Sequence, residues 1–167
     1  TQDIFKKKEK KIIKINDDQL TSIIVLSYNT LYYTRKTIES IVLHTSEPYE
    51  IIIVDNNSKN KVTLNYFKYL KSNFPNTIKI YDYNRSFNYS KINNYAFKFT
   101  NGNVILFLNN DVEFVCSNWG YELASNAIRP SIGCVGSKLL YPNKTIQHAG
   151  VVLGIHGTAG HSHKYFR

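Results

Sequence analysis

Four short apolar runs rich in β-branched residues recur along the chain, and the segments between them space their apolar residues as helices do. The runs cover residues 22–27, 50–54, 77–81 and 104–108. Runs without polar alternation are typical of strands buried on both faces of a parallel sheet, and the third run, which does alternate, predicts a less buried strand. Strands that alternate with helices predict an α/β fold with right-handed crossovers and a mainly parallel, doubly wound sheet.

The segments between the runs predict three helices. The first places Ile38 and Ile41 near one face, the second covers residues 62–70, and the third extends from a cap at Ser90 to Phe99. The predicted order is therefore strand, helix, strand, helix, strand, helix, strand.

The last third of the chain has a different pattern. It predicts a helix over residues 119–127, a short strand over residues 132–136, and a glycine- and histidine-rich mobile loop over residues 147–163 that closes over a site. Three histidines stand in that loop: His148, His161 and His163. Their spacings match no common zinc motif, so we expect no independent zinc site.

Composition excludes several classes of protein. The 167 residues suffice for about one domain, and a hydrophobic content of 43% argues against a wholly disordered chain. No apolar run is long enough for a transmembrane helix. The net charge is +9, but no nucleic-acid-binding motif is present, so we expect no nucleic-acid partner. Without a glycine-rich phosphate loop, dinucleotide oxidoreductases and P-loop enzymes are not expected either.

Residues 1–20 predict a basic leader or linker, and residues 21–167 a folded domain. The leader contains six lysines: Lys6, Lys7, Lys8, Lys10, Lys11 and Lys14. A solvated segment and a contact with anionic lipid or another domain both account for this charge. The chain opens on Thr1 and contains no Met, which suggests a piece of a longer protein.

Polar clusters follow three of the four predicted strands, at residues 28–29, 55–57 and 109–111. Asparagine and aspartate are common in turns, so each cluster alone has a structural explanation. The carboxyl ends of parallel strands meet at one edge of the sheet, where ligands of such folds bind. The three clusters together therefore predict a ligand site at that edge.

Three side chains near this edge have specific chemistry. Asp111 could hold Mg²⁺ or Mn²⁺ against a diphosphate, with His161 as a further ligand, or serve only as a turn residue. Asp55 could accept the imide N–H of a uracil or thymine ring, or cap the following helix. Arg85 could pair with phosphate oxygens or be a solvated surface residue.

Several ordered motifs resemble the family 2 glycosyltransferases with a GT-A fold, especially the rhamnosyltransferase-like branch that builds bacterial surface polysaccharides. The matching stretches are residues 22–29, 53–58, 87–94, 106–113 and 133–142, continuing through 147–151. The resemblance implies a GT-A nucleotide-diphospho-sugar transferase fold, with helices on both faces of the sheet and incomplete at the C-terminus. Residues 21–167 would then be the donor-binding part of that domain.

The resemblance also implies a donor site. Its residues would be Leu26, Tyr28, Asn29, Asp55, Asn57, Arg85, Asn93, Asn110 and Asp111. Leu26 and Tyr28 would line the base pocket, and Asp55 would read the base. Asp111 matches the last acid of the family's Asp-x-Asp motif and would bind Mn²⁺ or Mg²⁺, whereas Asn109 replaces the first acid. Asn110 would lie near the ribose or the sugar.

Enzymes of this family transfer the sugar with inversion, and a carboxylate base deprotonates the acceptor hydroxyl. No acid follows Glu122, so we expect the general base beyond Arg167 and an inactive fragment. The resemblance implies a nucleotide-diphosphate sugar donor and a glycan or lipid-linked acceptor. It also implies a cytoplasmic location with peripheral association at the inner face of the membrane. A non-catalytic nucleotide-sugar-binding module and a structural domain are the alternatives.

Overall fold

A computed structural model describes residues 19–154 and 157–167. The chain forms two compact units, divided after Ile128. The basic leader predicted over residues 1–20 lies almost wholly outside the described residues. Within the described part, no helix is both long and apolar enough to cross a membrane.

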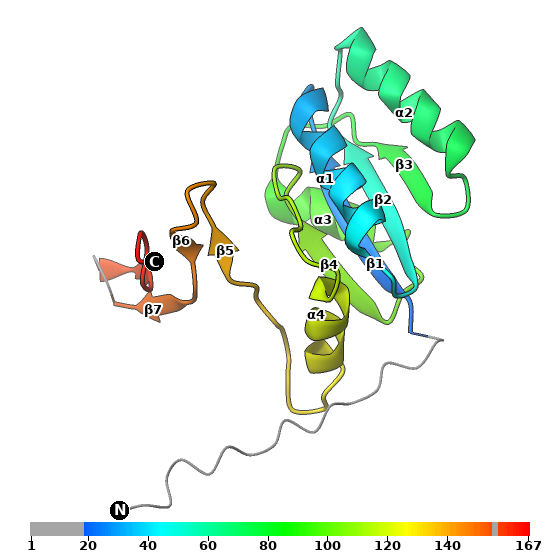
Figure 1. Cartoon of the computed structure of the whole chain (residues 1–167). Coiled ribbons are helices and arrows are strands. Elements are labelled where there is room, and N and C mark those ends of the chain that lie inside the picture. The colour runs from blue at the N-terminus through cyan, green and yellow to red at the C-terminus, as the bar shows by residue number, and fades with distance from the viewer. Residues whose placement is uncertain (1–18, 155–156) are drawn as a thin grey trace, which may run out of the picture. The chain divides into compact units, whose positions relative to one another are not determined.

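A four-stranded parallel sheet forms the centre of the first unit (Figure 1). Its strands are β1 (Thr21–Ser27), β2 (Tyr49–Asp55), β3 (Ile78–Asp82) and β4 (Val104–Leu108). They lie in the order β3-β2-β1-β4, and every neighbouring pair is parallel. The predicted α/β fold with a parallel sheet is confirmed.

Four helices accompany the sheet: α1 (Leu31–His44), α2 (Lys61–Asn73), α3 (Tyr89–Phe97) and α4 (Trp119–Ala127). Residues of α1 and α2 pack on one face of the sheet, and residues of α3 pack on the other (Figure 1). The helices between the strands thus cover both faces, which explains why the central strands consist of unbroken apolar runs.

Alternate side chains of one strand pack on opposite faces. In β1, Ile23 and Val25 pack in the core with Ile38 of α1, whereas Ile24 packs in a second core with Ile92 of α3. All five side chains are at most 2% exposed. Replacing any of these isoleucines with alanine would cost about 2–5 kcal/mol of stability, so both cores stabilise the sheet.

Asparagine side chains cap two of the helices. Asn60 caps α2, where its side chain accepts the backbone N–H groups of Val62 and Thr63. Asn88 caps α3 by accepting the N–H of Lys91, so the predicted cap at Ser90 is wrong. Asn88 has an extended backbone, which aims its side chain at the first turn, whereas Ser90 already lies inside the helix.

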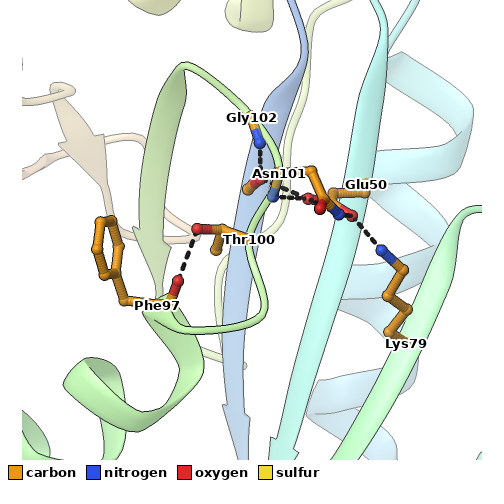
Figure 2. Close-up of polar contacts among 7 residues, drawn as sticks. Glu50, Lys79, Phe97, Thr100, Asn101 and Gly102 are labelled. Carbon is orange, nitrogen blue, oxygen red and sulfur yellow. Dashed lines mark hydrogen bonds and ion pairs between the residues drawn. The ribbon is translucent and has the colours of Figure 1, made fainter.

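The buried carboxylate of Glu50 connects neighbouring strands at the amino edge of the sheet, where the parallel strands begin (Figure 2). It accepts hydrogen bonds from Lys79 at 2.8 Å, from the Ser22 hydroxyl at 2.7 Å and from the backbone N–H of Asn101 at 2.6 Å. Burial raises the pKa of Glu50, but these hydrogen bonds outweigh it and lower the pKa to about 2. Gly102 passes so close that an added Cβ would lie 2.4 Å from the Leu20 carbonyl oxygen.

The second unit contains two small antiparallel sheets. The pair β5 (Leu139–Leu140) and β6 (Ile146–His148) forms one, and β7 (Val151–Leu153) and β8 (Ala159–His161) form the other. Residues 147–163 are therefore not simply a loop. The predicted strand over residues 132–136 is wrong: this segment is irregular and exposed, and none of the strands in the described part of the chain pairs with it.

Candidate functional site

β1 lies where the connections of the sheet change sides. From β1 the chain runs through α1 and α2 to β2 and β3, and then returns through α3 on the opposite face to β4, beyond β1. In open α/β sheets, ligands bind outside the carboxyl ends of the strands at such a switch point. A ligand site is therefore expected where β1 and β4 end, with β2 beside them.

Asp55 ends β2, and its side chain is only 3% exposed. Its carboxylate accepts hydrogen bonds from the backbone N–H of Ser58, at 3.1 and 3.3 Å, and from the Ser58 hydroxyl. Burial raises the pKa of Asp55; the bonds from Ser58 lower it in part, and the nearby charge of Asp82 raises it again. The pKa stays above its usual range, and Ser58 holds the carboxylate in one orientation.

Asn29 joins the end of β1 to the start of α2. Its side-chain oxygen accepts the backbone N–H groups of Lys59 and Asn60 at 2.8 and 2.9 Å, and its own N–H donates to Ser58 at 2.8 Å. Its φ of 51° is one that asparagine tolerates better than most residues. Asn57 also has a positive φ, of 65°, but its side chain is exposed at this edge. Asn29 therefore organises the loop after β2, whereas Asn57 is accessible.

Asn56 is missing from the predicted site residues, although it supports one of them. Its side-chain amide donates to the carbonyl oxygens of Tyr83 and Arg85 at 2.9 and 2.8 Å. Arg85 itself is exposed, and its guanidinium carbon lies 6.0 Å from the centre of the Tyr83 ring. Asn56 thus fixes the backbone that carries Arg85 beside the end of β2. Its position between Asp55 and Asn57, in the polar cluster after the strand, is the sequence signal that could have identified it.

Asn110 ties the turn after β4 to α1. Its side-chain amide donates to the hydroxyl oxygens of Thr30 and Thr34, the latter at 3.1 Å. The Thr34 hydroxyl also lies 2.9 Å from that of Ser27 at the end of β1. The next residue, Asp111, is exposed. An accessible carboxylate therefore stands at the switch point on a turn that is fixed to β1.

The remaining predicted donor-site residues differ in their surroundings. Leu26 is half-buried near the end of β1 and packs against the core on the α3 side, whereas Tyr28, just beyond it, is 57% exposed. Asn93 is buried on α3, where its amide donates to the Tyr89 carbonyl at 2.9 Å. Tyr28 is therefore accessible to a ligand ring, while the Asn93 amide bonds to its own helix.

Oxygen donors at the carboxyl edge suit a hard divalent cation. Asp111 and Asn109 are both exposed in the turn after β4, and Mg²⁺ and Mn²⁺ prefer carboxylate and carbonyl oxygens. Across residues 19–154 and 157–167, no three His, Cys, Asp or Glu side chains gather closely enough to hold a metal ion. An ion at Asp111 would therefore take most of its ligands from a bound diphosphate and water.

His161 belongs to the second unit and contacts another histidine there. The Nδ1 atoms of His148 on β6 and His161 on β8 lie 2.9 Å apart. The two rings line a cavity of about 300 Å³ together with Leu139, Tyr141, Gln147 and Lys164. Asp111 belongs to the first unit, so coordination of one ion by Asp111 and His161 stays a prediction.

Comparison with solved structures defines the class of fold. The mannosyltransferase PcManGT of Pyrobaculum calidifontis, solved in complex with GDP-Man and Mn²⁺, matches with a TM-score of 0.64 and 16% sequence identity. The match covers 74% of this chain and 36% of that chain. This likeness shows the fold of a GT-A glycosyltransferase.

Sequence comparison identifies the family. Residues 22–147 match the model of glycosyl transferase family 2, and the chain belongs to this family. It is 41% identical over 145 residues to the uncharacterized protein y4gI of Sinorhizobium fredii, across 86% of this chain and 16% of the relative. It is 43% identical over 128 residues to the O-antigen biosynthesis protein RfbC of Myxococcus xanthus, across 76% of this chain and 10% of the relative. The chain thus spans less than a fifth of either relative.

Proposed function

We propose that this chain binds a nucleotide-diphosphate sugar and forms the donor-binding part of an inverting glycosyltransferase in cell-surface polysaccharide synthesis. The observation that carries the proposal is the position of the turn 109–111 at the carboxyl end of β4, next to β1 and one strand away from Asp55. Family membership and the similarity to an O-antigen biosynthesis protein support the reaction class and the pathway.

The donor diphosphate would meet the divalent cation at Asp111. The similar mannosyltransferase was solved with both GDP-Man and Mn²⁺, which supports a site of this kind here. When bound, the cation would neutralise the charge that develops on the leaving diphosphate. Asp111 would hold it from the protein side, and the exposed guanidinium of Arg85 would pair with phosphate oxygens.

The nucleoside would lie toward β2. Asp55 would accept a hydrogen bond from the base, and Tyr28 would pack against its ring. Ser58 restrains the Asp55 carboxylate through the two hydrogen bonds that it donates, so less conformational freedom would be lost on binding. The acceptor, a glycan or a lipid-linked sugar, and the general base would involve residues beyond Arg167. Membrane association stays a prediction of the resemblance.

Calorimetric titration with UDP, dTDP and GDP, each with and without Mn²⁺, tests this function. We expect one nucleotide to bind in a metal-dependent manner, and Asp111→Asn to weaken that binding by at least about tenfold because it removes the anionic ligand. Glu113→Gln is the matched control: it removes one charge two residues further on, from an exposed side chain that is 60% accessible, and should bind as wild type does. Equal binding by wild type and Asp111→Asn, or no binding of any nucleotide by wild type, would contradict the proposal.

A further inference from the structure

Thr34 is a fully buried polar residue between the end of β1 and the turn after β4. Its side chain is 0% exposed on the first turns of α1. Its hydroxyl oxygen accepts the Asn110 amide at 3.1 Å and lies 2.9 Å from the Ser27 hydroxyl. One side chain therefore connects the two strands at the switch point, on the inner side of the turn that presents Asp111.

The chemistry of these groups determines which of them donates and which accepts each hydrogen bond. An amide nitrogen only donates, so Asn110 requires an oxygen acceptor from Thr34. The hydroxyl proton of Thr34 then points away from Asn110 and is available to Ser27, which is itself 3% exposed. Thr30, the residue before α1, also accepts from Asn110, and its side chain makes no cap bond to its own helix. The hydroxyl oxygens of both threonines thus accept hydrogen bonds from the turn after β4.

We infer that Thr34 is a positioning residue that holds Asn110, and through it the carboxylate of Asp111, in the geometry that binds the cation of the donor complex. The metal-binding half of this inference rests on the proposed function; the restraint of the turn does not. The side-chain nitrogen of Asn110 accordingly anchors the turn to α1. The contact with the ribose or the sugar that the family resemblance implies for Asn110 stays a prediction.

Two substitutions at position 34 separate the hydroxyl from the shape of the side chain. Thr34→Val keeps the volume but leaves Asn110 and Ser27 without their shared partner, whereas Thr34→Ser keeps the hydroxyl. Ser22→Ala is the control for general destabilisation, because it breaks a buried hydrogen-bond network at the amino end of the same strand. Asn110→Ala removes the anchor from the other side.

Hydrogen exchange of the peptide over residues 108–114 tests the restraint without any ligand. We expect exchange there to rise about tenfold in Thr34→Val and in Asn110→Ala, and to stay at the wild-type rate in Thr34→Ser and Ser22→Ala. In the double variant of Thr34→Val with Asn110→Ala, the two effects should not add, because Asn110→Ala already removes the hydrogen bond to Thr34 together with the one to Thr30. Unchanged exchange in Thr34→Val, or an equal rise in Ser22→Ala, would overturn the inference.

Titration with Mn²⁺ in the presence of the nucleotide that wild type binds tests the metal-binding half. Loss of a group that orients a metal ligand typically weakens metal affinity about 10–100-fold. We expect a loss of about tenfold in Thr34→Val, with affinity recovered in Thr34→Ser and retained in Ser22→Ala. If wild type binds but Thr34→Val binds equally well, the positioning role is wrong. If wild type itself binds nothing, the proposed function fails, and the exchange result still decides whether Thr34 restrains the turn.

Discussion

Asn109 and Asp111 both lie on the exposed turn after β4. Only Asp111 offers a carboxylate to a bound cation, because Asn109 carries an uncharged amide. In the Asp-x-Asp pattern of the family the first position is also an acid. A second carboxylate about 4 Å from a divalent ion would add roughly 2 kcal/mol of Coulombic attraction in water, which screening by salt reduces to roughly 1 kcal/mol. With asparagine at position 109, the proposed cation would depend on the diphosphate for most of its negatively charged ligands.

Asn109→Asp should therefore raise the Mn²⁺ affinity of the nucleotide complex by about fivefold, and more strongly at low salt. Titration of Mn²⁺ at two ionic strengths measures the change. Asn103→Asp adds the same charge on an exposed residue at the amino edge of the sheet, next to the start of β4, and should leave the affinity unchanged. A gain of similar size in both variants would mean that the Mn²⁺ affinity depends on the net charge of the chain and not on the position of the added carboxylate.

At the scale of elements, Glu50 joins segments that are distant in the sequence. It lies on β2 and bonds to Ser22 of β1, to Lys79 of β3 and to Asn101 in the loop before β4 (Figure 2). The carboxylate therefore stabilises the amino edge of the sheet, opposite the edge that carries the candidate site. Because its pKa is lowered to about 2, it stays charged in the folded state at any pH near neutrality.

This lowered pKa makes the free energy of unfolding depend on pH in the acidic range. The pKa of Glu50 is lower in the folded than in the unfolded chain, so its contribution is present above about pH 4.5 and is lost as the pH falls toward 2. The contribution is at most about 3 kcal/mol, and solvent screening reduces it because the Lys79 side chain is 33% exposed.

Glu50→Gln should lower the free energy of unfolding at pH 7 by about 2 kcal/mol, and the gap to wild type should close as the pH falls from 4.5 to 2. Urea denaturation across this pH range measures both effects. Glu39→Gln is the control, because Glu39 pairs with Arg35 at a surface where both side chains are more than half exposed, and its loss should change stability by less than about 0.5 kcal/mol. A constant gap at all pH values would refute the assignment to the Glu50 charge.

At the scale of the whole molecule, the two units differ in how many of their side chains are buried. The first has two cores, whereas none of the described residues of the second, 129–154 and 157–167, is buried. Its strands form only pairs, and isolated pairs of strands are marginal in water. We therefore expect the stability of the chain to reside in the first unit.

Native-state hydrogen exchange should show this difference directly. Amides of β1 and β2 should exchange only through global unfolding, while those of β5 to β8 should open with free energies several kcal/mol lower. The chain measured alone by mass spectrometry gives both values in one experiment. Protection of β7 and β8 equal to that of β1 would show that the second unit acquires a core that its exposed side chains do not indicate.

Much of the first unit could be predicted because its signals are local. The run 51–54 lies in a strand buried on both faces, and residues 119–127 form a helix as expected. The cap at Asn88 and the short strands after residue 138 could not be predicted with the same reliability. Asn88 and Ser90 are both good capping residues, and only the backbone conformation at position 88 decides between them.

For the site, the sequence alone placed Asp55 and the cluster 109–111 directly after strands, because an apolar run followed by turn residues is a pattern of neighbouring positions. Which strand ends lie side by side depends on strand order, which is set by crossovers and packing between distant segments. Only the tertiary structure put β4 beside β1 and so brought Asn110 to Thr34, 76 positions apart. A hydrogen bond over such a separation leaves no periodic trace in the sequence, since each partner by itself is an ordinary polar residue in a turn or a helix.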